Sequence, residues 1–427
     1  MAAPGGDQGG EFRAGTGPSR RISRRAVLAA AGGAGIGGAV AATTAVALTA
    51  GSPGGADQTV AFWGANQAGI DTPVQQHLLF AAFDVVTTAR VELTGVLEEW
   101  TAAAARMTAG QTAQPLTGNP YVATADTGEA VDLPPSRLTL TLGFGSGLFT
   151  TAGFDRFGLA ARRPPALVDL PAFPGDQLDP SRCGGDLAVQ ACADDPQVAF
   201  HAIRELALIG QGAVTLRWIQ AGFLPTPSTT PDTSPRNLLG FQDGTNNIRP
   251  GDASDMGRFV WAGNEGPAWM TGGTYLVARR IRVTVEKWDR TALGVQEETV
   301  GRHKASGAPL GQARASDPVD LGVVVDGRPV IPADAHIRLA GPAANGGQRI
   351  LRRGYSFSDG LDGHGLLDAG LFFVAFQCDP RKQFIPIFNR LAASDALAQY
   401  VVHTGSAVFA CPGGAGAGGW VGRPLFA

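Results

Sequence analysis

The order in which helical and strand patterns follow one another limits the fold of this chain more than any other feature. In the first half, apolar residues recur at helical spacing in some segments and alternate in others, as they do in strands. Pro196 marks the beginning of the second helix, because proline fits the first turn of a helix. In chain order, a strand, a helix, two strands, a helix and a strand are predicted over residues 78–86, 91–100, 138–143, 186–191, 195–208 and 215–221.

This order is that of a ferredoxin-like α+β unit. The second half shows a similar pattern, with predicted strand and helical segments at residues 274–285, 296–302, 372–377 and 384–400. A stretch rich in Pro, Thr and Ser at residues 224–236 separates the two halves. We therefore expect two tandem ferredoxin-like domains with antiparallel sheets packed together, one over residues 57–225 and one over residues 226–427.

The segment before these domains has the pattern of an export signal. Ser23, Arg24 and Arg25 precede a long uncharged run of mostly small residues, which is typical of the twin-arginine route. A transmembrane anchor is the alternative, since the run is long enough to span a bilayer, but its many glycines argue against it. We expect residues 1–56 to be a signal peptide and linker and the mature protein to have no stable membrane anchor. Export would place it in the periplasm, on the cell-wall side or outside the cell.

Charge and cysteine content exclude several classes of protein. A net charge of −3 and a pI near 6.1 give no basic field for a nucleic acid, so small soluble partners fit better. The four cysteines form neither a C-x-x-C pair nor a C-x-x-C-H motif, which excludes covalent attachment of a c-type haem. Cys183 and Cys192 are close enough in sequence to bridge in an oxidising compartment, and free buried thiols are the alternative.

An aspartate and an arginine suggest a reaction. Asp243 lies in the sequence Gly-Phe-Gln-Asp-Gly-Thr-Asn-Asn of residues 240–247. On its own, an Asp-Gly-Thr sequence is more often a type I turn capped by the aspartate. A carboxylate can also move a proton between the two oxygens of a bound peroxide. A cation such as Arg352 would stabilise the negative charge that develops on the leaving oxygen and keep the carboxylate ionised.

His336 is the candidate metal ligand. Its neighbours offer few polar groups other than cations, and a neutral imidazole can bind ferric iron when its other nitrogen donates to an acceptor. The other histidines have ordinary surroundings in the sequence, and no H-E-x-x-H motif indicates a zinc hydrolase. An acid, an imidazole and a guanidinium are the groups that a haem peroxidase needs.

Many further segments match one family in the correct order. The chain resembles the dye-decolorizing (DyP-type) peroxidases, in particular the exported bacterial branch that also contains deferrochelatase-like proteins. The resemblance covers nearly all of the chain after the signal. Its motifs include residues 184–187, 192–196, 240–247, 272–275, 286–290, 307–310 and 349–356.

The resemblance implies one non-covalent haem b (heme b) per chain, bound in the C-terminal half. It assigns Asp243 as the distal acid and base, His336 as the proximal ligand and Arg352 as the distal arginine. The family's arginine stands two residues before a Gly or Asn, which selects Arg352 rather than Arg353. The backbone of Asp243, Gly244 and Thr245 would lie against the haem.

Two further roles are less closely defined by the resemblance. Asp395 is the expected hydrogen-bond acceptor of the proximal histidine, with Asp379 as the alternative. The family commonly has Asn-Pro-Arg soon after the proximal ligand, whereas this chain has Gly-Pro-Ala at residues 341–343. Arg338 or Arg349 would then replace the missing arginine as a contact of the haem propionates.

The expected function is a peroxidase that uses hydrogen peroxide to oxidise dyes, phenols or other reducing substrates by one-electron steps. The alternative is a haem-handling protein of the deferrochelatase kind, which releases iron from haem. Aromatic residues that could relay electrons, though each is more often simply core, are Trp261, Trp269, Trp288, Tyr275 and Tyr355. The oligomeric state stays open, a homo-oligomer included.

Overall fold

The structure, a computed structural model, describes residues 58–225 and 234–427, and the predicted export signal lies outside these residues. Its main feature is a nine-stranded sheet in which every pairing is antiparallel. The strands are β1 (His77–Val85), β2 (Thr139–Gly145), β3 (Leu187–Ala193), β4 (Val214–Phe223), β5 (Thr274–Val283), β8 (Leu351–Arg352), β9 (Tyr355–Leu361), β10 (Leu367–Gln377) and β11 (Val401–Cys411). A separate small hairpin consists of β6 (Val324–Val325) and β7 (Arg328–Pro329).

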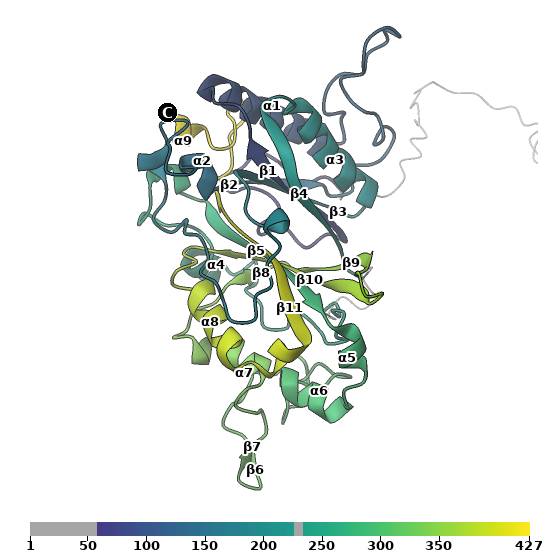
Figure 1. The fold of residues 1–427 in the computed structure, drawn as a ribbon, viewed down its shortest axis with the longest axis vertical. Helices are drawn as coiled ribbons and strands as arrows, with labels where there is room; N and C mark the ends of the chain where they lie inside the picture. The colour runs from purple at the N-terminus through teal and green to yellow at the C-terminus, as the bar shows by residue number, and fades with distance from the viewer. Residues whose placement is uncertain (1–57, 226–233) are drawn as a thin grey trace, which may run out of the picture. The chain divides into compact units, whose positions relative to one another are not determined.

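The sheet has two halves of equal strand order. The N-terminal half has the order β4-β1-β3-β2, and the C-terminal half has the order β11-β5-β10-β9. The halves meet along two short seams, where Phe409 pairs with Gly145 and Phe223 pairs with Ser356. Because β5 pairs with both β10 and β11, the strands close into a ring. Figure 1 shows the N-terminal strands above the C-terminal strands.

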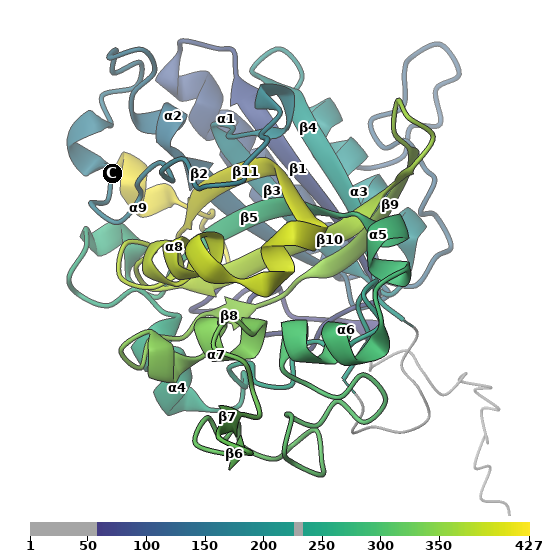
Figure 2. The same ribbon diagram turned by 60° about the horizontal axis from the view of Figure 1, so that its bottom comes forward.

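Helices cover the outside of this ring. The α-helices are α1 (Arg90–Thr108), α2 (Ser146–Phe149), α3 (Pro196–Ile209), α4 (Ala253–Phe259), α5 (Val285–Asp289), α6 (Leu293–Val300), α7 (His336–Ala340), α8 (Phe384–Ser394) and α9 (Arg423–Phe426). Helices α1 and α3 lie on the N-terminal half, while α6, α7 and α8 lie on the C-terminal half (Figure 2). Among the described residues, no helix is long and apolar enough to cross a membrane.

Two apolar cores stabilise the arrangement. One lies between the N-terminal strands and helices α1 and α3, where Trp100 and Phe83 are fully buried. The other lies between the two halves of the sheet and contains Phe80, Phe372 and Phe409. Complete burial of such aromatic side chains stabilises the fold by about 1.5–3 kcal/mol each. The joined halves therefore form a rigid support for the helices outside them.

The predicted elements of the first half are confirmed to within a few residues, apart from the first helix, which continues to Thr108. In the second half, the prediction missed β9 and β11, and the helix predicted over 384–400 is interrupted at Asp395. This residue has extended backbone angles, and its side chain caps a 3-10 helix over Ala396–Tyr400. All four cysteines are free, so the disulfide alternative is not adopted.

Candidate active site

The interruption at Asp395 places a carboxylate beside the predicted metal ligand. His336 is the first residue of α7, and its Nδ1 lies 2.6 Å from Asp395 Oδ2. The other oxygen of Asp395 accepts a hydrogen bond of 2.8 Å from the backbone N–H of Leu397. Because Asp395 is fixed by the backbone, it also fixes the orientation of the imidazole, with Nε2 as the nitrogen that remains for a metal.

Electrostatics at His336 follow from the same contact. Burial lowers the pKa of His336, but the charge of Asp395 and its hydrogen bond outweigh burial, so the pKa lies above its ordinary value. A carboxylate partner in this position makes an imidazole a more basic ligand. The sequence offered Asp395 and Asp379 for this role, and the structure brings Asp395 to the histidine. Asp379 instead pairs with Arg381.

The second charged pair joins Asp243 to Arg352. Nη1 of Arg352 lies 3.1 Å from Oδ1 of Asp243, and the backbone N–H of Gly244 also donates to Oδ1 at 2.7 Å. Gly244 has a φ of +81°, a left-handed conformation that glycine adopts without strain. A backbone hydrogen bond from the N–H of Asn247 to the carbonyl of Gly244 closes a turn directly after Asp243. That turn presents the carboxylate to the arginine.

Asn247 connects the Asp243 loop to β8. Its Nδ2 donates to the carbonyl of Arg352 at 2.7 Å, and its Oδ1 accepts from the N–H of Arg352 at 2.9 Å. The side-chain amide thus pairs with both backbone groups of Arg352, as a neighbouring strand would, and fixes Arg352 relative to the Asp243 loop. Nothing in the local sequence indicates this role, since it depends on a contact 105 residues away.

Replacing Asn247 by alanine is expected to misplace Asp243 relative to Arg352. We expect the rate constant for reaction with hydrogen peroxide to fall by about 10- to 100-fold, because small displacements of reacting groups have effects of this size. Haem content should stay unchanged. Stopped-flow absorbance of haem-loaded protein measures the rate. Asn247→Asp keeps the acceptor for the Arg352 N–H, so its rate constant should fall less than that of Asn247→Ala. An equal fall in both variants would contradict the positioning role of Asn247.

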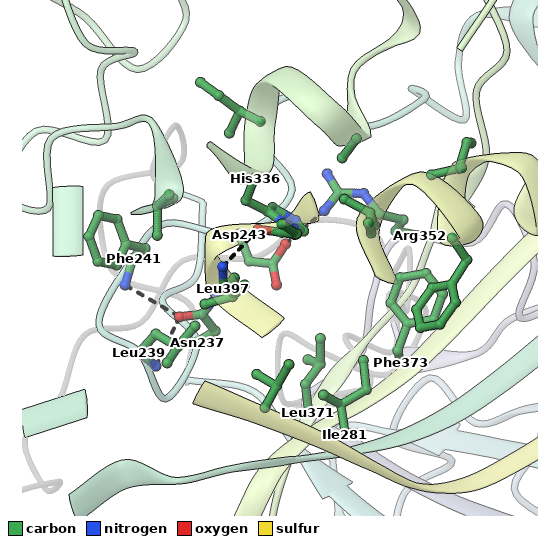
Figure 3. Close-up of a pocket in the computed structure, with 18 of the residues that line it drawn as sticks. Asn237, Leu239, Phe241, Asp243, Ile281, His336, Arg352, Leu371, Phe373 and Leu397 are labelled. Carbon is green, nitrogen blue, oxygen red and sulfur yellow. Dashed lines mark hydrogen bonds and ion pairs between the residues drawn. The ribbon is translucent and has the colours of Figure 1, made fainter. Parts of the chain in front are cut away.

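Both charged pairs line one cavity of about 310 Å³. In Figure 3, His336, Asp243 and Arg352 occupy the upper part of the view, and the apolar side chains of Ile281, Leu371 and Phe373 line the lower part. The predicted residues Gly244, Thr245 and Asp395 also line this cavity. Further apolar walls come from α8 and β5, through Phe384, Ile387, Phe388, Leu391 and Val283.

The structure separates the two arginines proposed as replacements for the missing family arginine. Arg338 directs its guanidinium to the backbone carbonyls of Leu321, Ile331 and Pro332 and does not line the cavity. Arg349 does line the cavity. Arg338 uses its donors within its own loop and lies outside the cavity, whereas Arg349 lines the cavity while its guanidinium pairs with Asp255 and donates to the carbonyl of Asn247.

Of two further arginines, Arg302 lines the cavity and Arg353 lies outside it. Arg353 lies next to Arg352 but points away, donating to Thr72 and Gln75. Arg302 lines the cavity although the sequence gave it no role. It is 4% exposed and donates to the carbonyl of Gly307 at 2.7 Å. Burial lowers the pKa of Arg302, and the nearby charge of Arg352 lowers it further.

His403 lines the cavity from β11 and should make the fold sensitive to acid. Burial, helped by the charge of Arg279, lowers the pKa of His403 to about 3. The unfolded chain therefore binds a proton below about pH 6.5 that the folded chain does not, so stability is lost as pH falls through that value. Between pH 7 and pH 5 we expect a loss of about 2 kcal/mol from this residue. Urea unfolding at both pH values measures this loss. The free energy of unfolding of His403→Gln should fall less between pH 7 and pH 5 than that of the parent protein. An equal fall in both proteins would contradict the role of His403.

These features define a class of protein. An imidazole oriented by a carboxylate can bind iron, and apolar walls suit a porphyrin. Arg302 and the Asp255-paired Arg349 line the cavity where the carboxylates of a porphyrin would need donors. The Asp243 and Arg352 pair adds groups that handle protons and negative charge. The donor set therefore fits haem, and the fold and cavity together are those of a haem peroxidase.

Comparisons with known proteins give the family. The family models for the N-terminal and C-terminal parts of Dyp-type peroxidases match residues 67–224 and 234–416. The chain is 39% identical over 362 residues to the dye-decolorizing peroxidase of Thermobifida fusca, covering 82% of this chain and 81% of that one. It is 38% identical over 382 residues to the deferrochelatase of Escherichia coli O6:K15:H31, covering 88% and 89%. The chain belongs to the Dyp-type peroxidase family.

Solved structures agree with this assignment. Ferric DtpA from Streptomyces lividans is 40% identical, with a TM-score of 0.80, and the match covers 88% of this chain and 99% of that one. The DyP-type peroxidase of Cellulomonas bogoriensis is 40% identical, with a TM-score of 0.78 and coverage of 87% and 99%. DypB from Rhodococcus jostii RHA1, solved in complex with heme, shares the fold at 20% identity and a TM-score of 0.59. The chain is thus a peroxidase whose cofactor is haem.

Proposed function

We propose that this peroxidase binds haem b through His336 and uses Asp243 and Arg352 to promote cleavage of hydrogen peroxide. The observation that supports this best is that both charged pairs, His336 with Asp395 and Asp243 with Arg352, line the same cavity. When bound, the haem supplies the redox centre to which reducing substrates such as dyes or phenols donate one electron at a time.

The residues of the cavity have distinct tasks in holding the cofactor. Nε2 of His336 would bind the iron, and Asp395 holds the ring in the required orientation. Arg302, together with Arg349, which is itself paired with Asp255, would contact the propionates in place of the arginine that this chain lacks. The backbone at Gly244 and Thr245, which lines the cavity, would lie against the porphyrin.

Asp243 has one oxygen available for proton transfer. Arg352 Nη1 and the Gly244 N–H both donate to Oδ1, and no hydrogen bond from the described residues reaches Oδ2. Oδ2 would accept the proton from one oxygen of a bound peroxide and return it to the other, leaving oxygen. The guanidinium of Arg352 stabilises the negative charge that develops there. The proton therefore leaves with water.

A stopped-flow experiment tests this proposal. The haem-loaded protein is mixed with one equivalent of hydrogen peroxide while the Soret band is recorded. A rapid spectral change, reversed by a phenolic reductant, supports a peroxidase with this mechanism. The family also contains proteins named deferrochelatase, and slow bleaching with release of iron would instead indicate haem handling.

We also propose that the two halves are tandem ferredoxin-like domains, over residues 57–225 and 226–427, with the haem in the second. Each half has a strand order of 4-1-3-2 when its four long strands are numbered in sequence, which is the order of that fold. The N-terminal half also inserts α1 and α3 at the expected points. His336, Asp243 and Arg352 all belong to the second half.

Export by the twin-arginine route is a further part of the proposal. It rests on Arg24 and Arg25 and on the uncharged run after them. The route carries folded proteins, so haem could be loaded before export. Expression of the full chain with Arg24→Lys and Arg25→Lys should keep the protein in the cytoplasm. Unchanged export of that variant would count against this route.

A further inference from the structure

A second polar cluster lies in the N-terminal half, away from the cavity. It joins α3 to the segment of residues 109–138, which connects α1 to β2 and contains no helix or strand. Asp126 and Glu205 are fully buried, and His201 is 4% exposed. Figure 1 shows α1 and α3 at the opposite end of the sheet from α7. Any role of this cluster is therefore separate from the peroxidase site.

The imidazole of His201 is buried with an unsatisfied nitrogen. Nδ1 lies 3.3 Å from Glu129 Oε2 and 4.0 Å from Glu205 Oε1, but within the described part of the chain it makes no hydrogen bond of acceptable geometry. Glu205 Oε2 is also buried without a partner among these residues. Buried polar atoms without partners cost about 1–3 kcal/mol each, so each of the two atoms indicates a missing partner. Glu205 Oε1, the oxygen at 4.0 Å from Nδ1, accepts from the N–H of Thr127 at 2.9 Å.

The other nitrogen of the ring has a different neighbour. Nε2 of His201 lies 3.5 Å from Asp126 Oδ2. Asp126 is held by the backbone N–H groups of Ala113 at 2.6 Å and Gly128 at 2.8 Å. A carboxylate fixed by the backbone on one side of an imidazole leaves the opposite nitrogen to face a ligand, as in many carboxylate–histidine–metal sites.

We propose that this cluster binds a divalent transition-metal ion, Zn²⁺ or Mn²⁺, through His201 Nδ1 and the carboxylates of Glu205 and Glu129. Around His201 Nδ1, Glu129 Oε2 lies at 3.3 Å and Glu205 Oε1 at 4.0 Å, close enough to surround one ion. An imidazole among carboxylates suits these ions better than Ca²⁺ or Mg²⁺, which prefer oxygen ligands alone.

Charge and chain organisation support a metal over an imidazolium. Three carboxylates meet at the ring, and Arg204 pairs only with the Oε1 of Glu129, at 3.1 Å, on the side away from His201 Nδ1. A protonated histidine would supply one positive charge, whereas a divalent ion supplies two. The ion would also fix the long segment 109–138 to α3, as structural metals do for segments without regular structure.

Metal content and calorimetry test the proposal on the haem-loaded protein. After dialysis against metal-free buffer with a mild chelator, mass spectrometry of the metals should find Zn or Mn in addition to haem iron, or calorimetry with Zn²⁺ and Mn²⁺ should show one added site. Ca²⁺ and Mg²⁺ serve as oxygen-preferring comparisons. Absence of both retained and added metal would overturn the proposal in favour of a buried imidazolium cluster.

Variants locate the site. His201→Gln and Glu205→Gln should weaken Zn²⁺ or Mn²⁺ binding by at least about tenfold, and Asp126→Asn by about 10-fold, the usual effect of an orienting partner. His303→Gln is the matched control, because His303 Nδ1 lies 3.0 Å from Glu297 on the surface. If the His303 variant weakens binding and the His201 variant does not, the proposal fails. If the buried variants do not fold, the metal content of the parent protein decides.

Discussion

Asp243→Asn is expected to slow the reaction with hydrogen peroxide by about 100- to 10,000-fold, the usual range for a general acid and base. The amide keeps the size of the side chain and can still accept hydrogen bonds from Arg352 and Gly244 through its oxygen. It cannot take up the peroxide proton at the other position. Haem content and unfolding midpoint should therefore change little. The measurement is the second-order rate constant from stopped-flow absorbance.

A closely matched control exists elsewhere in the chain. Asp84 pairs with Arg217 at 3.1 Å, the same distance that separates Asp243 from Arg352. The side chains are also similarly exposed, at 39% and 35% compared with 31% and 32%. Asp84→Asn should leave the peroxide rate unchanged. An Asp243→Asn variant with full activity would show that the proton moves through another group.

His336→Ala should remove the iron ligand and weaken retention of haem. Loss of a partner that only orients a ligand typically costs about 10- to 100-fold in affinity, so loss of the ligand itself should exceed about 100-fold. Asp395→Asn should weaken haem retention by only about 10- to 100-fold, because the imidazole keeps its iron-binding nitrogen but loses its fixed acceptor at 2.6 Å. The rate of haem transfer to an excess of apomyoglobin measures both effects.

Two controls show whether His336 retains haem as the iron ligand or only by packing against it. His303→Gln is again a suitable control, since this histidine has a carboxylate partner but does not line the cavity. Adding imidazole should partly restore haem retention in His336→Ala if the lost group is the ligand. Retention equal to that of the parent protein in His336→Ala would mean that another residue binds the iron.

Prediction from sequence succeeded where a local pattern was sufficient. The helix at Pro196–Ile209 begins where it was predicted to begin, because Asp195 caps it and proline fits its first turn. It failed at Asp395, because the helical spacing of apolar residues over 384–400 was given more weight than Ser394 and Asp395, which are typical cap residues. The helix breaks here because the Asp395 side chain accepts hydrogen bonds from the N–H of Leu397 and from His336, and the Asp395 backbone is extended.

The sequence by itself determined the family and indicated the candidate reactive residues, because most of the family's motifs are local: Asp243 before glycine, and Arg352 two residues before Gly354. Only the tertiary structure decided which candidates meet, with Asp395 and Arg349 at the cavity and Asp379 and Arg338 elsewhere. The physical reason is sequence separation. The contacts that build the site join residues 59 and 109 positions apart in the sequence. Closure of the sheet and the packing of α7 against α8 bring these residues together, and no local sequence pattern predicts either.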